Sequence, residues 1–304
     1  MSLYNKYRPS ELSEFFGNES VVSRVESVLS RMKQEIPHAW LFSGPPGTGK
    51  TSLARVIAKR LGCSEMDLQE IDIGDLRGID SIRDIRRQMG LAPLQGSCRV
   101  WILDEAARMT SDAQAALLKS LEDTPPHVYF MLATTDPQKL LKAILSRCME
   151  FQVGPLQEEQ LVRLLRTVIR KEGKQVSLDI LKSIALNSLG HPRNALVLLD
   201  SVIDLPAEQR QKAIEQEAAK QNQVIDLCRI LIKGAKWKDV SKVLSGLKGE
   251  EPEGVRRAVL GYCASVLLSE DSPRAFLVMD AFKQPTYDIG WPGVVLAAYE
   301  AVQL

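Results

Sequence analysis

The sequence predicts an α/β fold with a parallel sheet in its first half and helices alone in its second half. In residues 1–153, apolar runs typical of buried strands alternate with stretches of helical periodicity. Beyond Gly154-Pro155, which interrupts this pattern, only helical periodicity recurs. A chain of 304 residues exceeds one typical core. We therefore expect a sheet domain over 1–153, a small three-helix unit over 154–204 and a helical region over 205–304.

The strongest local signal is a glycine-rich stretch between the apolar run Ala39–Phe42 and a segment of helical periodicity. Residues 44–51 read Gly-Pro-Pro-Gly-Thr-Gly-Lys-Thr, a phosphate-binding loop of the Walker A type. In such a loop the backbone N–H groups surround an anion at a helix N-terminus. We expect Lys50 to reach the β- and γ-phosphates and the Thr51 hydroxyl to bind Mg²⁺. The expected nucleotide contacts in this loop are Gly44, Pro45, Pro46, Gly47, Thr48, Gly49, Lys50, Thr51 and Ser52.

Two carboxylates follow the apolar run Arg99–Leu103. Open α/β sheets place their chemistry at the carboxyl ends of the strands. We expect Asp104 to hold Mg²⁺, directly or through water, and Glu105 to polarise the water that attacks the γ-phosphate. Acidic pairs at strand ends also arise by chance, but the position of this pair downstream of a phosphate loop favours a catalytic role.

Several polar groups leave two interpretations open. Thr135, after the apolar run Tyr129–Ala133, is either a site hydroxyl or part of a threonine-capped turn. Arg8 and Pro9 belong either to an arm packed on the domain or to a contact with adenine. Arg193 either reaches toward the γ-phosphate or caps its own helix.

A cluster of arginines is equally ambiguous. Arg77, Arg83, Arg86 and Arg87 form either a solvated helix face or a set of contacts to nucleic-acid phosphates. Composition alone marks Arg147 only as a surface cation. Further along, Ser111 and Gln114 resemble a helix capping box.

Composition bears on the possible ligands of the protein and on its location in the cell. The formal net charge of +1 neither demands nor forbids nucleic acid. The five cysteines lack paired two-residue spacing, which favours free thiols over disulfides or zinc. The three histidines show no metal-ligand spacing. No targeting segment and no run of about 18 apolar residues is found, so we expect a cytoplasmic protein without membrane contacts.

The last hundred residues carry no phosphate, metal or nucleophile motif. Their helices are either a self-contained bundle or an oligomerisation surface. We favour oligomerisation, because one expected helix offers little polar surface at Leu260, Tyr262, Val266, Leu267 and Leu268.

Together these motifs resemble the AAA+ clamp-loader ATPases. The segments Ala133–Leu140 and Ile144–Cys148 are similar to the bacterial DNA polymerase III gamma/tau subunits. The stretch Arg77–Arg83 is more similar to the replication factor C small subunits. The resemblance spans Tyr4 to about Leu199 and implies an AAA+ sheet domain, a three-helix lid and a C-terminal helical collar.

The resemblance implies specific roles. Thr135 becomes the first sensor and Arg193 the second. Arg147 becomes an arginine finger in the nucleotide site of a neighbouring subunit. Arg77 and Arg83 become contacts to duplex phosphates, and Arg8 with Pro9 becomes the adenine contact.

The resemblance also implies a function. The chain would be the ATP- and Mg²⁺-dependent motor subunit of a clamp loader, acting in a ring, expected to be pentameric, with other clamp-loader subunits, a sliding clamp and primer-template DNA. Two rivals are an AAA+ branch-migration translocase, expected to end in a winged DNA-binding domain, and a non-hydrolysing scaffold subunit of the same ring.

Two departures from the family pattern stand out. The bacterial subunits carry a four-cysteine zinc insertion after the phosphate-loop helix. Here only Cys63 precedes Glu70, so we expect no zinc. After Asp104-Glu105 the family has a residue and then a histidine or similar polar group, whereas Ala106-Ala107 follow here. This departure bears on how DNA binding is coupled to hydrolysis.

Overall fold

A computed structural model describes residues 2–73, 79–250, 252–269, 272–286 and 289–303. The chain divides into two compact units, Met1–Arg210 and Gln211–Leu304. The first unit holds both the sheet and the helices of the expected lid. The finer boundaries at 153/154 and 204/205 stay predictions.

The first unit is built on a five-stranded, wholly parallel sheet with the strand order β2-β3-β4-β1-β5. The strands are β1 (Ala39–Ser43), β2 (Cys63–Asp72), β3 (Cys98–Asp104), β4 (Val128–Thr134) and β5 (Met149–Gln152). Every residue of β1 and β4 is buried. Strands covered on both faces show continuous apolar runs, and these runs are the pattern that predicted the sheet. The predicted α/β fold class is confirmed.

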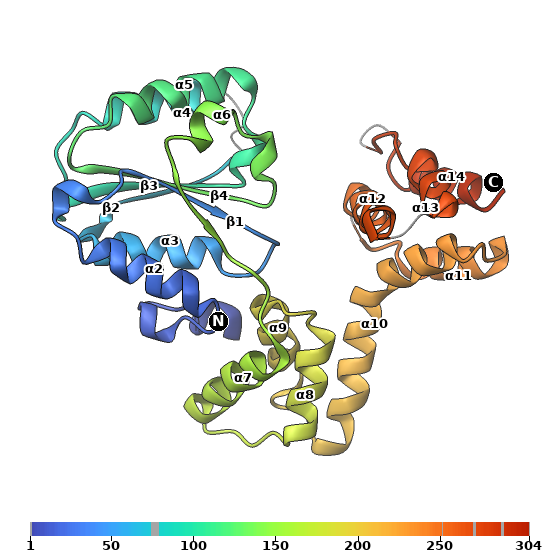
Figure 1. Cartoon of the computed structure of the whole chain (residues 1–304). Helices are drawn as coiled ribbons and strands as arrows, with labels where there is room; N and C mark the ends of the chain where they lie inside the picture. Colours follow the sequence, from blue (N-terminus) through green and yellow to red (C-terminus); the bar gives the residue numbers. More distant parts are fainter. Residues whose placement is uncertain (1, 74–78, 251, 270–271, 287–288, 304) are drawn as a thin grey trace. The chain divides into compact units, whose positions relative to one another are not determined.

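Helices cover both faces of this sheet (Figure 1). On one face lie α2 (Glu19–Leu29) and α3 (Lys50–Arg60), which share a core with Trp40, Phe42 and Phe151. On the other lie α4 (Ile79–Gln88), α5 (Ser111–Glu122) and α6 (Lys142–Leu145), which pack on Trp101 and Phe130. Short 3₁₀ turns occur at Leu12–Glu14, Lys33–Glu35, Ala106–Arg108 and Pro137–Lys139.

The start of α5 corrects one prediction. The N-cap is Thr110, whose side chain accepts a hydrogen bond from the Ala113 N–H, and Ser111 is already helical. Gln114 is buried and does not close a capping box. Its side chain instead donates to the carbonyls of Met109 and Lys139. The extended backbone of Thr110, which sequence spacing does not reveal, decides which hydroxyl caps the helix.

Three helices follow the sheet in the first unit, and the N-terminal segment packs against them. They are α7 (Glu158–Glu172), α8 (Leu178–Asn187) and α9 (Pro192–Val202). The short helix α1 (Leu3–Lys6) lies on α9, where the Leu3 side chain is buried and the Leu3 N–H donates to Asp200 over 3.4 Å. The Tyr7 hydroxyl donates to Glu172 on α7 over 2.5 Å. The N-terminal segment is thereby attached to the lid helices.

The second unit is helical throughout its described residues. Its helices are the C-terminal part of α10 (Ala207–Ile232), α11 (Trp237–Gly246), α12 (Pro252–Ser269), α13 (Pro273–Ala281) and α14 (Trp291–Gln303). Leu260, Tyr262, Val266 and Leu267 pack partly buried against this unit's own core, and Leu268 lies outside the residues whose side chains are described. The exposed large apolar side chains of this unit are instead those of Phe276, Ile289, Val295, Leu296 and Tyr299.

Within the described ranges, none of the helices combines the length and the apolar character that crossing a membrane requires.

Candidate functional site

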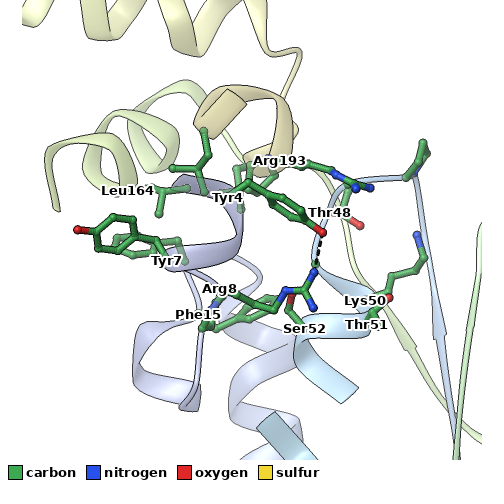
Figure 2. Close-up of a pocket in the computed structure, with 18 of the residues that line it drawn as sticks. Tyr4, Tyr7, Arg8, Phe15, Thr48, Lys50, Thr51, Ser52, Leu164 and Arg193 are labelled. Carbon is green, nitrogen blue, oxygen red and sulfur yellow. Dashed lines mark hydrogen bonds between the residues drawn. The ribbon is translucent and has the colours of Figure 1, made fainter. Parts of the chain in front are cut away.

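A cavity of about 350 Å³ opens at the carboxyl end of the sheet (Figure 2). Five parts of the first unit line it: the phosphate loop with the start of α3, the ends of β2 and β3, the N-terminal segment, α7 with the residues just before it, and the start of α9. The predicted residues that line it are Arg8, Pro9, Pro46, Gly47, Thr48, Gly49, Lys50, Thr51, Ser52, Asp104, Glu105 and Arg193.

The backbone of the loop requires its glycines. Gly44, Gly47 and Gly49 have φ angles of 144°, 74° and 104°, a region that side chains disfavour. A Cβ added at Gly44 would also lie 2.1 Å from the carbonyl oxygen of Val153. The left-handed Gly49 is the N-cap of α3, so the loop leads directly into the helix N-terminus. This arrangement suits an anion such as a nucleotide phosphate.

Lys50 is the buried cation of this loop. Its Nζ donates to the carbonyls of Gly44 over 2.9 Å and Pro45 over 2.8 Å. Burial lowers the pKa of the Lys50 ammonium, and the nearby charges of Asp104 and Glu105 oppose that shift. An ammonium whose hydrogen-bond partners are neutral carbonyls keeps its charge available for an anionic ligand.

The start of α3 meets the end of β3. The Thr51 hydroxyl donates to Oδ2 of Asp104 over 2.7 Å, while Oδ1 of Asp104 accepts the Glu105 N–H over 2.9 Å. A hydroxyl and a carboxylate are the hard oxygen ligands that Mg²⁺ prefers. These two residues therefore fit a Mg²⁺ ion beside the nucleotide phosphates.

Glu105 has an unusual backbone. Its φ of 53° lies in the left-handed region, which is uncommon for residues other than glycine and costs about 1–3 kcal/mol where it is held. Its half-buried side chain lines the cavity, with Oε2 3.7 Å from Nε of Arg108.

The opposite wall carries two arginines on one aromatic ring. Nη2 of Arg8 donates to the Tyr4 hydroxyl over 2.7 Å, and the Arg8 guanidinium lies 5.3 Å from the centre of the Tyr4 ring. The Arg193 guanidinium lies 4.5 Å from the same centre. The two arginines come from opposite ends of the first unit's sequence, and the structure brings both to the cavity (Figure 2).

Other predicted residues do not line the cavity. Thr135 follows β4 and is exposed, whereas the buried Thr134 accepts the Asp136 N–H. Arg147 lies beyond α6, where it donates to Glu122 over 2.6 Å. Arg83 is exposed on α4, and Arg77 lies outside the described residues.

Several lining residues escaped sequence reasoning. Asp72 ends β2 directly beside Asp104, since the two are register partners. Its place at the carboxyl end of a strand is the usable signal, although β2 itself is a mixed and only partly buried strand. Glu70, on the same strand, also lines the cavity. The remaining ones give no such signal, because they depend on how the N-terminal segment, α7 and α9 pack; they are Tyr4, Tyr7, Glu14, Phe15, Phe16, Leu156, Leu164, Pro192 and Leu196.

The cysteines are free thiols in this structure. Across the described residues, His, Cys, Asp and Glu side chains do not form a group of three or more that suits a metal ion. The expectation that zinc is absent stays a prediction.

Comparison with known proteins finds matches to bacterial replication proteins. The family model for the DNA polymerase III delta subunit matches residues 66–157. The DNA polymerase III subunit tau of Bacillus subtilis is 34% identical over 228 residues, which cover 68% of this chain and 40% of that protein. The gamma subunit of Buchnera aphidicola subsp. Acyrthosiphon pisum is 33% identical, and the match covers 67% of this chain and 62% of that protein. The tau subunit of Escherichia coli is 36% identical, and the match covers 66% of this chain and 34% of that protein. The chain thus spans about two fifths of the length of the Bacillus subtilis relative.

Comparison of folds adds solved structures of Thermotoga maritima RuvB. The one described as a Holliday junction branch migration motor is 23% identical, with a TM-score of 0.59, and the match covers 75% of this chain and 78% of that one. At this identity the likeness shows the AAA+ fold alone.

Proposed function

Because the chain belongs to the AAA+ clamp-loader family of the DNA polymerase III gamma/tau subunits, we propose that it is an ATP-dependent motor subunit that loads a sliding clamp onto primer-template DNA. The observation that carries the proposal is that the phosphate loop, Asp104 and Glu105 line the same cavity. The names of the relatives support a role in DNA replication, and the phosphate loop supports binding of a nucleotide.

ATP binding is assigned to the loop and the N-terminal arm. The loop N–H groups and Lys50 hold the phosphates, as the glycine backbone and the buried ammonium support. Arg8 and Pro9 contact the adenine, in keeping with their place on the cavity wall. Arg193 approaches the γ-phosphate from α9 and acts as the second sensor.

Hydrolysis is assigned to the carboxylates. Thr51 and Asp104 hold Mg²⁺, which when bound neutralises phosphate charge. Glu105 orients the attacking water, and the strained backbone at this residue supports a functional role. Thr135 contributes a hydroxyl as the first sensor. An intact set of these groups distinguishes a motor from a non-hydrolysing scaffold subunit.

Assembly and DNA contacts complete the proposal. Subunits form a ring, taken to be pentameric, through the C-terminal helices, and Arg147 enters the site of the next subunit. Arg77 and Arg83 contact DNA phosphates. The assignment of Arg83 is supported by its exposed position on α4. The apolar residues Ile82 and Ile85 of the same helix are buried in the core against the sheet.

A branch-migration translocase is the rival from another class. The RuvB likeness supports the shared fold only. The second unit is helical over its described residues, whereas the rival was expected to end in a winged domain.

The first experiment tests the division of roles in the cavity. Lys50→Ala is expected to abolish tight ATP binding, whereas Glu105→Gln is expected to bind ATP and not hydrolyse it, because only Glu105 acts on water. Isothermal titration and phosphate release measure the two properties. Equal loss of affinity in both variants would contradict the assignment.

The second experiment separates clamp loader from translocase. ATPase rates are measured with no DNA, with primed DNA, and with primed DNA plus the clamp of the same replication system. A clamp loader is stimulated by primed DNA and further by its clamp, whereas a translocase responds to junction DNA and ignores the clamp.

The DNA contact is tested on Arg83. Arg83→Ala is expected to lower the slope of log affinity against log salt by about one, with basal ATPase retained. Arg166→Ala, at an arginine on α7 that is also exposed, is the matched control and should leave the slope unchanged. An unchanged slope in Arg83→Ala would mean that Arg83 belongs to a solvated helix face and does not contact DNA.

A further inference from the structure

The Tyr4 side chain lies between Arg8 and Arg193 in the cavity wall (Figure 2). Its hydroxyl accepts from Arg8, and both guanidinium groups lie within about 6 Å of the ring centre, the range of a cation–π contact. Arg8 comes from the N-terminal arm and Arg193 from the second residue of α9. One ring thus contacts both cations that this wall presents to the phosphate loop.

Tyr4 is itself firmly placed. It belongs to α1, whose preceding residue Leu3 is buried against α9 and donates to Asp200 there. After α1, Tyr7 donates to Glu172 on α7. Because contacts on both sides of Tyr4 join the segment to the lid helices, its ring stays with α9.

A fixed aromatic ring offsets the repulsion between the two guanidinium groups on this wall. Two arginines that face one cavity repel each other, and exposed arginine side chains lose rotamer freedom when they are ordered. The electron-rich ring face attracts a cation, and the hydroxyl fixes the second one through a hydrogen bond. Arg193 is exposed, and within the part of the chain that the structure describes its guanidinium contacts the Tyr4 ring.

We infer that Tyr4 is a positioning residue that holds Arg193 toward the γ-phosphate position through its ring and Arg8 toward the base through its hydroxyl. This inference rests on the proposed ATP binding. The ring contact then governs the preference for ATP over ADP, because only Arg193 is assigned to the γ-phosphate. The hydroxyl contact governs the affinity for both nucleotides equally.

The test is a double-mutant cycle on nucleotide preference. Affinities for ATPγS and ADP are measured by titration in the full-length chain for wild type, Tyr4→Leu, Arg193→Gln and the double variant. Tyr4→Leu is expected to lower the ATPγS-to-ADP affinity ratio by about threefold to tenfold, the range of a partly desolvated cation–π contact. In the Arg193→Gln background the same substitution should leave the ratio unchanged.

Conservative variants separate positioning from mere packing. Tyr4→Phe keeps the ring and is expected to retain the wild-type ratio while weakening both nucleotides. Asn5→Ala, at an exposed position of the same short helix that does not line the cavity, is the matched control and should leave the ratio unchanged. If Tyr4→Leu lowers the melting temperature markedly, Tyr4→Met, which fills the space without a ring, takes its place in the cycle.

The outcomes are distinguishable. A ratio unchanged in Tyr4→Leu, or lowered by the same factor in the Arg193→Gln background, overturns this inference alone, provided that the wild-type chain binds ATPγS and Lys50→Ala does not. A wild-type chain that binds no ATPγS overturns the proposed function and this inference with it.

Discussion

The Thr51 hydroxyl donates a hydrogen bond of 2.7 Å to Oδ2 of Asp104, joining the first turn of α3 to the last residue of β3. The two residues stand 53 positions apart in the sequence. Their contact places a hydroxyl and a carboxylate at the same end of the sheet as the phosphate loop. Such a pair can bind a divalent ion jointly, and neither residue alone supplies enough ligands.

Loss of the Thr51 hydroxyl should therefore reduce the effect of Mg²⁺ on nucleotide affinity. We expect Thr51→Val to bind ATP in EDTA about as well as wild type, and to gain roughly tenfold less affinity when Mg²⁺ is added. Titrations at fixed ATP and increasing Mg²⁺ measure this gain. Thr48→Val is the matched control, because the Thr48 hydroxyl donates to the Pro45 carbonyl within the loop. If both variants lose the Mg²⁺ effect equally, the ion is not held at Thr51.

The sheet and the phosphate loop were predictable because their signals are local. A strand buried on both faces must be an apolar run, and a loop with positive φ angles must carry glycines at fixed positions. β5 (Met149–Gln152) escaped prediction, because only Phe151 among its four residues is buried. Its place beside β1 is fixed by strand pairing, which a short run of mixed residues does not reveal.

The far wall of the cavity was not predictable in the same way. Arg8 and Arg193 were suspected through a family resemblance, yet Tyr4 was not, since its role depends on α1 packing against α9. Asp72 is not among the site residues that the sequence predicts. Its place beside Asp104 follows from the order of β2 and β3, which local sequence does not determine.

A second prediction concerns the connection between the sheet and the lid. Asn18 donates to the Gly154 carbonyl over 3.1 Å and accepts the Gly154 N–H over 2.8 Å, with its own φ at 51°. Asn18→Gly should lose about 1–2 kcal/mol of unfolding free energy, because both hydrogen bonds disappear. Asn18→Ala should lose about 1 kcal/mol more, because a Cβ disfavours the left-handed backbone that glycine adopts freely.

Denaturant titrations of the full chain measure both losses. The ordering of the two variants is the informative result. If Asn18→Ala were as stable as Asn18→Gly, the left-handed backbone at this position would carry no strain. If Asn18→Gly were as stable as wild type, the two hydrogen bonds to Gly154 would contribute nothing.

A third prediction concerns acid stability of the second unit. Glu253 is buried, with hydrogen bonds from Arg256, Arg257 and the backbone and hydroxyl of Thr286. The Arg256 guanidinium, followed by Thr286 and Arg257, lowers the pKa of the Glu253 carboxyl from 4.5 to about 2 against the opposing effect of burial. A depressed pKa stabilises the fold above pH 4.5, and this stabilisation is lost as the pH falls through 2.

Glu253→Gln should therefore cost on the order of 3 kcal/mol at neutral pH, with the difference from wild type shrinking between pH 4.5 and 2. Hydrogen exchange of α12 across a denaturant series measures this cost. Asp280→Asn is the control, since Asp280 pairs with Lys283 in an exposed bridge of little expected value. A cost that stays constant down to pH 2 would exclude titration of Glu253 as its origin.

The last prediction asks whether the nucleotide site is shared between subunits. Arg147 does not line the cavity of its own chain, and its guanidinium donates to Glu122. An arginine that acts on a neighbour's nucleotide would offset the charge that develops on the γ-phosphoryl oxygens, an effect of roughly 10³ to 10⁵ in rate. We therefore expect Arg147→Ala and Glu105→Ala each to be nearly inactive in ATP hydrolysis.

Mixing the two inactive variants should restore part of the activity, because some interfaces then pair an intact Glu105 from one chain with an intact Arg147 from another. Exchange of labelled subunits is verified in the same mixture. Glu122→Ala, which only releases the Arg147 side chain, is the matched control and should stay active. A mixture that exchanges subunits and stays as inactive as its parts would assign Arg147 to its own chain or to structure alone, because no shared site then remains to be rebuilt.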